Sequence, residues 1–203
     1  MKLFNIDSGF YKFISRFFDL VKLNFLWLLF CLPVITIGAS TTAAYGVALK
    51  MVDDEESYIA RSFVREFKRN FKQGTVLGLI FIVATYAIYL DYEINRISED
   101  GSIPLIVIGI LSAFIYVSAM LYSFPLLARY ENSVIGTIQN SMEISRRYFG
   151  RTLLITGVLA VEFVVFNFNS ILQGIGFFFG GAFGIFTVAA FAKRIFQEIE
   201  RGD

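Results

Sequence analysis

The chain has 203 residues, of which 56% are hydrophobic and only 17% are charged. Soluble domains carry about 25% charged residues, so this composition excludes an ordinary water-soluble protein. The net charge of +1 predicts no nucleic-acid partner, and the absence of histidine removes the commonest metal ligand and general base.

The first 22 residues predict an amphipathic helix. Ile14 and Phe17 belong to a set of apolar residues at helical spacing, and the cationic residues Lys12 and Arg16 lie between members of this set. We expect residues 1–22 to lie in the plane of the membrane interface, with the apolar face toward lipid.

Four long apolar tracts follow, each with at most one charged residue: residues 23–49, 73–90, 101–128 and 152–192. A helix of about 20 apolar residues crosses the hydrocarbon core of a bilayer. The sequence therefore predicts an all-α, polytopic membrane protein that forms a single domain over residues 1–203.

The basic residues orient these tracts. Seventeen of the 18 Lys and Arg residues lie on one side of the alternating pattern, and the exception is Arg96 in an acidic segment. By the positive-inside rule, both termini, residues 50–72 and residues 129–151 are cytoplasmic, whereas residues 91–102 and 167–174 face outward.

This orientation has a consequence for residues 23–49, because both flanks of that tract are cytoplasmic. A single span cannot begin and end on one side, so the tract must turn back. Pro33 and Gly38 predict the break, with one arm at about 17–32 and the other at about 40–52. Together with the spans expected at residues 74–92, 103–128, 152–168 and 171–192, the hairpin gives six membrane segments.

One ionisable residue, Glu162, falls near the middle of a predicted span. Such residues usually face the interior of the bundle, where Glu162 would be either functional or a structural hydrogen-bonding group. The broken hairpin and the outer turn supply further polar groups for a candidate membrane site: Asn24, Thr36, Ser40, Thr41, Thr42, Asn167, Asn169 and Gln173. A merely structural bend and an ordinary polar turn are the alternatives.

A glycine face is predicted on the last span. Gly176, Gly180 and Gly184 repeat at every fourth residue, which lets another helix approach closely. The neighbour is either another helix of this chain or a second membrane protein.

Two segments, residues 57–72 and 133–149, read as cytoplasmic amphipathic helices. Either they lie on anionic lipid or they dock on a partner. The candidate contact residues of the first are Arg61, Phe63, Arg65, Phe67, Lys68, Arg69 and Phe71. The apolar stripe of the second consists of Ile135, Ile138, Met142 and Phe149.

Sequence motifs for catalysis are absent. The chain contains no GxxxxGK[ST], GxGxxG, HExxH, GxSxG or CxxC pattern. We therefore expect no catalytic residues, no metal, no cofactor and no nucleotide partner.

Residues 23–80 carry a family resemblance. Leu32-Pro33, Thr36-Ile37-Gly38, the run from Thr41 to Ala44 and a pattern of the form SF...FK.NFKQ that ends at Gln73 resemble the YesL-like family. This is a family of uncharacterised integral membrane proteins, best represented in Gram-positive bacteria. The resemblance implies a location in the bacterial cytoplasmic membrane and an accessory role beside carbohydrate ABC importers.

Two hypotheses for the function follow. The first is a non-catalytic accessory or regulatory subunit of a carbohydrate (oligosaccharide) ABC importer, which would contact the permease and membrane lipid. The alternative is a small secondary carrier with a site at the bilayer midplane, formed by the broken hairpin and Glu162.

Overall fold

The computed structural model describes residues 9–53, 55, 58–97 and 103–202, and every regular element in these ranges is helical. The α-helices are α1 (Gly9–Cys31), α2 (Ile37–Val52), α3 (Ile59–Ile97), α4 (Ile103–Arg129), α5 (Val134–Arg147), α6 (Phe149–Asn167), α7 (Ser170–Ile175) and α8 (Gly181–Arg201). A 3-10 turn, η1 (Val34–Thr36), joins α1 to α2, and a π-helical turn, η2 (Gly176–Gly180), joins α7 to α8. The predicted all-α fold is confirmed.

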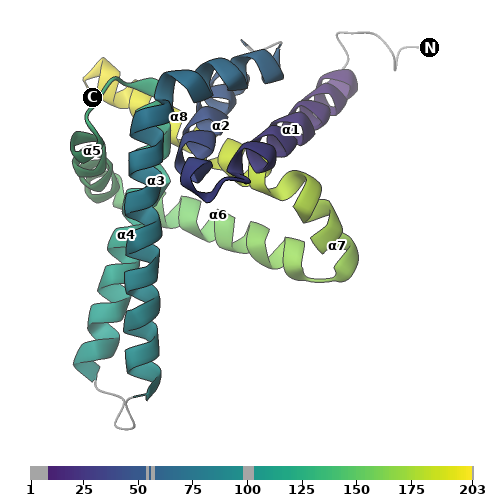
Figure 1. Cartoon of the computed structure of the whole chain (residues 1–203). Coiled ribbons are helices and arrows are strands. Elements are labelled where there is room, and N and C mark those ends of the chain that lie inside the picture. The colour runs from purple at the N-terminus through teal and green to yellow at the C-terminus, as the bar shows by residue number, and fades with distance from the viewer. Residues whose placement is uncertain (1–8, 54, 56–57, 98–102, 203) are drawn as a thin grey trace.

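The helices form a bundle with one long projection. Figure 1 shows α3 and α4 descending side by side beyond the other helices, whereas α5 and α8 lie near the upper end with the C-terminus. The end that carries α5, the C-terminal ends of α2 and α8 and the start of α3 is called the basic end below. It corresponds to the predicted cytoplasmic side.

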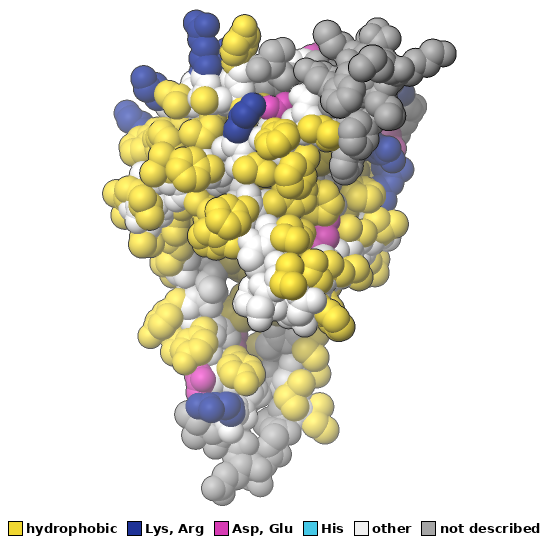
Figure 2. Space-filling view, turned by 90° about the vertical axis from the view of Figure 1, so that its right-hand side faces the viewer, with side chains coloured by type: hydrophobic (Ala, Val, Ile, Leu, Met, Phe, Trp, Pro, Cys, Tyr) yellow, Lys and Arg dark blue, Asp and Glu magenta, His cyan; other side chains and the backbone are white. Residues whose placement is uncertain are grey.

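The surface between the two ends is that of a membrane protein. Hydrophobic side chains cover most of the broad middle of the molecule in Figure 2, and Lys and Arg gather toward its top. Many large apolar side chains of α4 and α6 are more than half exposed, for example Ile110 at 65% and Phe163 at 70%. Lipid removes such side chains from water, so their exposure is expected in a bilayer.

The prediction of six membrane segments is wrong in its count. Four stretches are long and apolar enough to span: Ile59–Arg96, Ile106–Arg129, Phe149–Asn167 and Ser170–Arg201. The first arm of the hairpin is not a membrane-spanning stretch because α1 carries Lys12, Arg16, Asp19 and Lys22 before its apolar part. The second fails because α2 has only 16 residues, most of them buried inside the protein.

The hairpin itself is present, with its break where Pro33 predicts it. The helix α1 ends at Cys31 and α2 begins at Ile37. The hydroxyl of Thr36 donates to the carbonyl oxygens of Phe30 and Pro33, both at 2.7 Å, so polar atoms freed at the break are paired.

At the centre of the bundle, α2 packs along α3 through small residues. A Cβ atom added to Gly38 would lie 2.5 Å from the Cα atom of Gly78, and one added to Gly74 would lie 2.8 Å from the Cα atom of Ala39. Only glycine permits this approach of two backbones. Gly74 and Gly78 thus form a small-residue face that serves packing within the chain.

Residues 59–72 do not form a separate interfacial helix. They are the first part of α3, which continues through Gly74 into the apolar span without interruption. No proline breaks this stretch, and packing against α2 holds its first turns. Residue 57 lies outside the described residues, as do residues 1–8 of the predicted N-terminal helix, whose remainder is continuous with the first hairpin arm in α1.

The helix α5 packs mainly through a face beside the predicted apolar stripe. Its buried residues are Thr137, Ser141, Ile144 and Ser145, whereas Ile135 and Met142 are 69% and 42% exposed. Hydroxyl groups explain the inward face, since the Oγ atom of Ser123 donates to that of Ser141 at 3.0 Å. Of the predicted apolar stripe, Ile135 and Met142 are therefore exposed, whereas Ile138 packs partly against the core and the ring of Phe149 lies 5.7 Å from that of Phe114.

Candidate functional site

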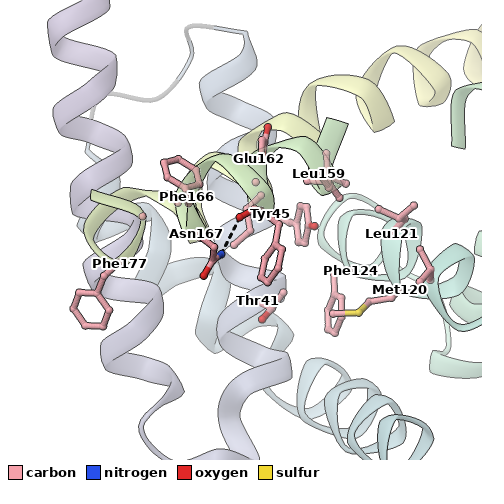
Figure 3. Close-up of a pocket in the computed structure, with 18 of the residues that line it drawn as sticks. Thr41, Tyr45, Met120, Leu121, Phe124, Leu159, Glu162, Phe166, Asn167 and Phe177 are labelled. Carbon is pink, nitrogen blue, oxygen red and sulfur yellow. Dashed lines mark hydrogen bonds between the residues drawn. The ribbon is translucent and has the colours of Figure 1, made fainter. Parts of the chain in front are cut away.

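A cavity of ≈ 610 Å³ opens among α2, α4, α6, η2 and α8. Figure 3 shows its lining, with Glu162 and Leu159 of α6 above Tyr45 of α2 in this view, and Phe124 and Met120 of α4 to one side. The lining contains four of the predicted polar residues and all three glycines of the predicted face: Thr41, Glu162, Asn167, Gln173, Gly176, Gly180 and Gly184. Residues from distant parts of the sequence thus meet at one site.

Glu162 provides the charged group of this cavity. Its Oε1 atom accepts a hydrogen bond of 2.8 Å from the hydroxyl of Thr187 on α8. No Lys or Arg stands among the described residues that line the cavity. The carboxylate therefore has one neutral donor and no positive partner at the site.

Tyr45 is the second polar group of interest. It is 7% exposed, and its hydroxyl makes no hydrogen bond within the described part of the chain. Burial raises the pKa of Tyr45, so the hydroxyl remains protonated and can donate a hydrogen bond. Thr41 is different, because its hydroxyl already accepts a hydrogen bond from Nε1 of Trp27 at 3.1 Å.

Asn24 shapes the cavity without lining it. Its side-chain nitrogen donates to the carbonyl oxygen of Phe177 at 2.9 Å, and its side-chain oxygen accepts from the backbone N–H of Ala182 at 2.9 Å. Phe177 lies in η2, where the π-helical register alters the usual backbone pairing. One buried amide from α1 therefore holds the turn that forms a wall of the cavity.

The predicted glycine face serves packing within the chain. A Cβ atom on Gly176 would lie 2.9 Å from Cβ of Phe166, and one on Gly180 would lie 3.3 Å from the ring of Phe166. A Cβ atom on Gly184 would lie 3.6 Å from Oε2 of Glu162. The glycines thus let α6 approach η2 and α8, and they leave room beside the carboxylate.

The side chains of other predicted polar residues form hydrogen bonds with the backbone. The hydroxyl of Ser40 donates to the carbonyl of Trp27 at 2.9 Å, and that of Thr42 donates to the carbonyl of Gly38 at 2.8 Å. The side chain of Asn169 accepts from the N–H of Leu172 at the start of α7. Ser40, Thr42 and Asn169 therefore do not belong to the cavity.

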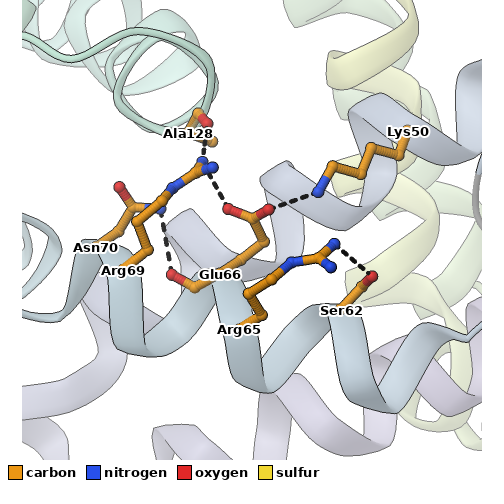
Figure 4. Close-up of polar contacts among 7 residues, drawn as sticks. All are labelled: Lys50, Ser62, Arg65, Glu66, Arg69, Asn70 and Ala128. Atoms are coloured by element: carbon orange, nitrogen blue, oxygen red, sulfur yellow. Dashed lines mark hydrogen bonds and ion pairs between the residues drawn. The ribbon is translucent and has the colours of Figure 1, made fainter.

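A second polar cluster at the basic end is centred on Glu66 of α3, which is fully buried. Figure 4 shows its carboxylate between Lys50 of α2, at 2.6 Å, and Arg69, at 2.5 Å. Arg69 also donates to the carbonyl oxygen of Ala128 at 2.7 Å. The cluster joins α2, α3 and the end of α4.

Lys193 of α8 is a buried cation at the same end. Its side chain pairs with Asp53, which follows α2. Burying a charge is costly unless it is paired, so these ion pairs fix how α8 and α3 meet α2.

The docking residues predicted on residues 57–72 have divided roles. Arg61, Arg65 and Lys68 are exposed, and Phe71 is 40% exposed. Phe63, in contrast, is fully buried, and Phe67 packs partly against the core. Arg69 belongs to the Glu66 cluster, so the available docking surface is mainly cationic.

The sequence contained a signal for the buried Glu66 that amphipathic reasoning missed. Ser62, Glu66, Asn70, Gly74 and Gly78 repeat every four residues along one face of α3, and all five are buried. Polar and small residues at this spacing mark a closely packed face in a membrane helix. The role of Tyr45 had no comparable signal, because its position depends on how α6 crosses the bundle.

The groups at the cavity are suited to binding. Within the described ranges, no group of three or more His, Cys, Asp or Glu residues is placed to hold a metal ion. The cavity combines an apolar, aromatic lining with one carboxylate and one free hydroxyl. It can hold an apolar molecule and recognise a charge or hydrogen-bonding group on it.

This architecture defines a helical, multi-pass membrane protein with a lipid-facing apolar surface. The family described as "Protein of unknown function, DUF624" matches residues 20–92, which cover the hairpin and most of α3. The predicted resemblance to a YesL-like family is confirmed by relatives from Bacillus subtilis (strain 168). "Uncharacterized protein YteU" is 28% identical over 77% of this chain and 71% of its own length, and "Uncharacterized protein YesL" is 25% identical over 85% and 88%. No solved structure matches the chain.

Proposed function

We propose that this protein is a non-catalytic accessory or regulatory subunit in the bacterial cytoplasmic membrane, linked to carbohydrate (oligosaccharide) import by an ABC importer. The carbohydrate link rests on the family resemblance. The accessory role is supported by the sites themselves, which offer surfaces and a binding cavity but no set of catalytic groups among the described residues.

The single observation that carries the proposal is the exposure of two apolar residues of α5, Ile135 and Met142, at the basic end. This helix uses its hydroxyl-bearing face to pack on α4, and it leaves Ile135 and Met142 exposed, with Arg146 one turn after Met142. At the basic end, such a face fits the cytoplasmic surface of a permease. Lipid is the competing occupant, because basic amphipathic helices also bind anionic membranes.

Site-specific crosslinking distinguishes the two occupants. A photoreactive amino acid at Ile135 or Met142, introduced in the native host, is expected to give adducts with a carbohydrate permease subunit. The same group at Val107, which is 47% exposed near the N-terminal end of α4, is the control and should label lipid alone. Lipid adducts alone at all three positions would contradict the proposal.

A small secondary carrier is the second candidate, favoured by a specific observation. Thr41 and Tyr45 of the second hairpin arm line the same cavity as Glu162. If the protein is a carrier, Glu162→Gln should abolish transport while the crosslinks from α5 persist. An accessory subunit predicts the reverse dependence, in which substitutions on α5 reduce uptake and Glu162→Gln does not.

A further inference from the structure

The starting observation is a carboxyl group at the cavity without a positively charged partner. Glu162 is the sole acidic or basic side chain among the described residues that line the site, and Thr187 occupies only its Oε1 atom. An ionised carboxylate within a membrane span is unfavourable unless a partner compensates it. A bound cation would provide that partner.

The walls are suited to a particular kind of cation. Aromatic rings from four elements, α2, α4, α6 and η2, line the cavity: Tyr45, Phe124, Phe163, Phe166 and Phe177. The rings of Tyr45 and Phe124 are stacked, with their centroids 6.4 Å apart. The faces of aromatic rings attract positive charge, and most of the remaining lining is apolar or glycine. An apolar body with a delocalised or shielded positive charge would satisfy both features.

We infer that this cavity binds a lipophilic organic cation, with Glu162 as its counter-charge and the aromatic walls around its apolar body. The cavity is open, and its surroundings on α6 are exposed apolar residues such as Val161 and Phe163. A molecule that partitions into the bilayer can therefore reach the site from the lipid. The inference gives the second candidate function a substrate class, but binding at the site does not depend on transport.

Two other occupants fit less well. A sugar needs many hydrogen bonds, and this lining offers few polar side chains beyond Glu162, Asn167 and Gln173. Asn167 already donates to the carbonyl oxygen of Phe163 at 2.8 Å. A lipid acyl chain would fill the apolar part but would leave the carboxylate without a positive partner.

The test uses the full chain in nanodiscs of zwitterionic lipid and measures equilibrium binding of radiolabelled tetraphenylphosphonium. Tetraphenylborate has the same shape and the opposite charge, so it serves as the matched ligand control. We expect saturable binding of the cation, no competition by the anion, and a loss of affinity of at least about tenfold in Glu162→Gln. Glu143→Gln on the exposed face of α5 is the control and should bind as wild type.

A second variant guards against misfolding of Glu162→Gln. Gly184→Ala places a methyl group 3.6 Å from Oε2 of Glu162 and 3.7 Å from Leu159, both ordinary contact distances. It should fold normally and weaken cation binding by narrowing the space beside the carboxylate. Wild-type affinity in both variants, equal competition by tetraphenylborate, or the absence of saturable binding would each overturn the inference.

Transport is measured separately, so the two ideas fail independently. Vesicles that contain the protein are loaded with unlabelled tetraphenylphosphonium, and exchange of external label is followed. Saturable binding without exchange would uphold the cation site and reject the carrier. Exchange that Glu162→Gln abolishes would support both.

Discussion

The side-chain oxygen of Asn24 accepts a hydrogen bond from the backbone N–H of Ala182, 158 positions later in the chain, at 2.9 Å. The nitrogen of the same amide binds the carbonyl oxygen of Phe177. The first helix is thus joined to the last membrane helix through backbone groups at a π-helical turn. The position of this turn also sets the positions of Gly176 and Gly180, which line the cavity.

Asn24→Ala should therefore destabilise the protein. It leaves one donor and one acceptor of the backbone buried and unpaired, and we expect a loss of about 2–4 kcal/mol in the free energy of unfolding. Asn24→Asp should also destabilise the protein, because it keeps the acceptor for Ala182 but sets a second acceptor against the carbonyl oxygen of Phe177. Thermal unfolding in detergent measures the effect, with Asn167→Ala as the control, since that amide bonds only within α6. An equal loss in the control would contradict the assigned role.

The Glu66 cluster predicts a difference between two ion pairs. Glu66 is buried and contacts Lys50 and Arg69, whereas Glu93 pairs with Arg96 on the exposed part of α3, at 2.8 Å. Removal of the buried charge by Glu66→Gln should cost about 1–3 kcal/mol of unfolding free energy.

The exposed pair should matter much less, with a loss below about 0.5 kcal/mol in Glu93→Gln. Chemical denaturation of both variants provides the comparison. A double-mutant cycle with Lys50→Met then isolates the pairwise energy at Glu66, which should be near zero if the carboxylate is held mainly by Arg69.

Close packing of α2 on α3 predicts a strong effect at Gly38. The added methyl group of Gly38→Ala would lie 2.5 Å from the Cα atom of Gly78, so the two backbones must separate. We expect a loss of at least about 1–3 kcal/mol, or failure to assemble. Gly157→Ala is the matched control on α6, because nothing lies within 4 Å of its added methyl group. Normal yield and stability of Gly38→Ala would show that α2 can shift without cost.

Sequence reasoning located the elements better than their faces. The break at Pro33, the all-helical fold and the turn after Asn167 follow from local chemistry, because proline and polar turn residues act on their own neighbours. Hydrophobic periodicity was right only in part for α5, where Ser141 and Ser145 face inward together with Ile138, whereas Ile135 and Met142 are exposed. In a membrane protein the apolar side of a helix need not be its packed side.

The candidate site was predictable only in part. Glu162, Thr41, Asn167 and Gln173 stood out as polar groups in or beside apolar tracts, and the structure brings them to one cavity. The partners of Asn24 could not be predicted, since they are backbone atoms released by a π-helical turn. The predicted count of six membrane segments failed for another reason. The second hairpin arm is a short helix buried in protein, and such a helix does not have to cross the bilayer.

The remaining prediction concerns orientation, and it rests on the distribution of basic residues together with the hairpin. The start of α3 and the end of α5 lie at the basic end, and residues 91–97 lie at the far end of the α3 projection. If the basic end is cytoplasmic, a membrane-impermeant thiol reagent should label Ser98→Cys in intact cells, in a Cys31→Ser background. Lys68→Cys and Arg147→Cys should react only after permeabilisation. The two outcomes at position 68 carry the most weight, because labelling from outside would place the start of α3 on the external face and would invert the positive-inside assignment for the whole chain.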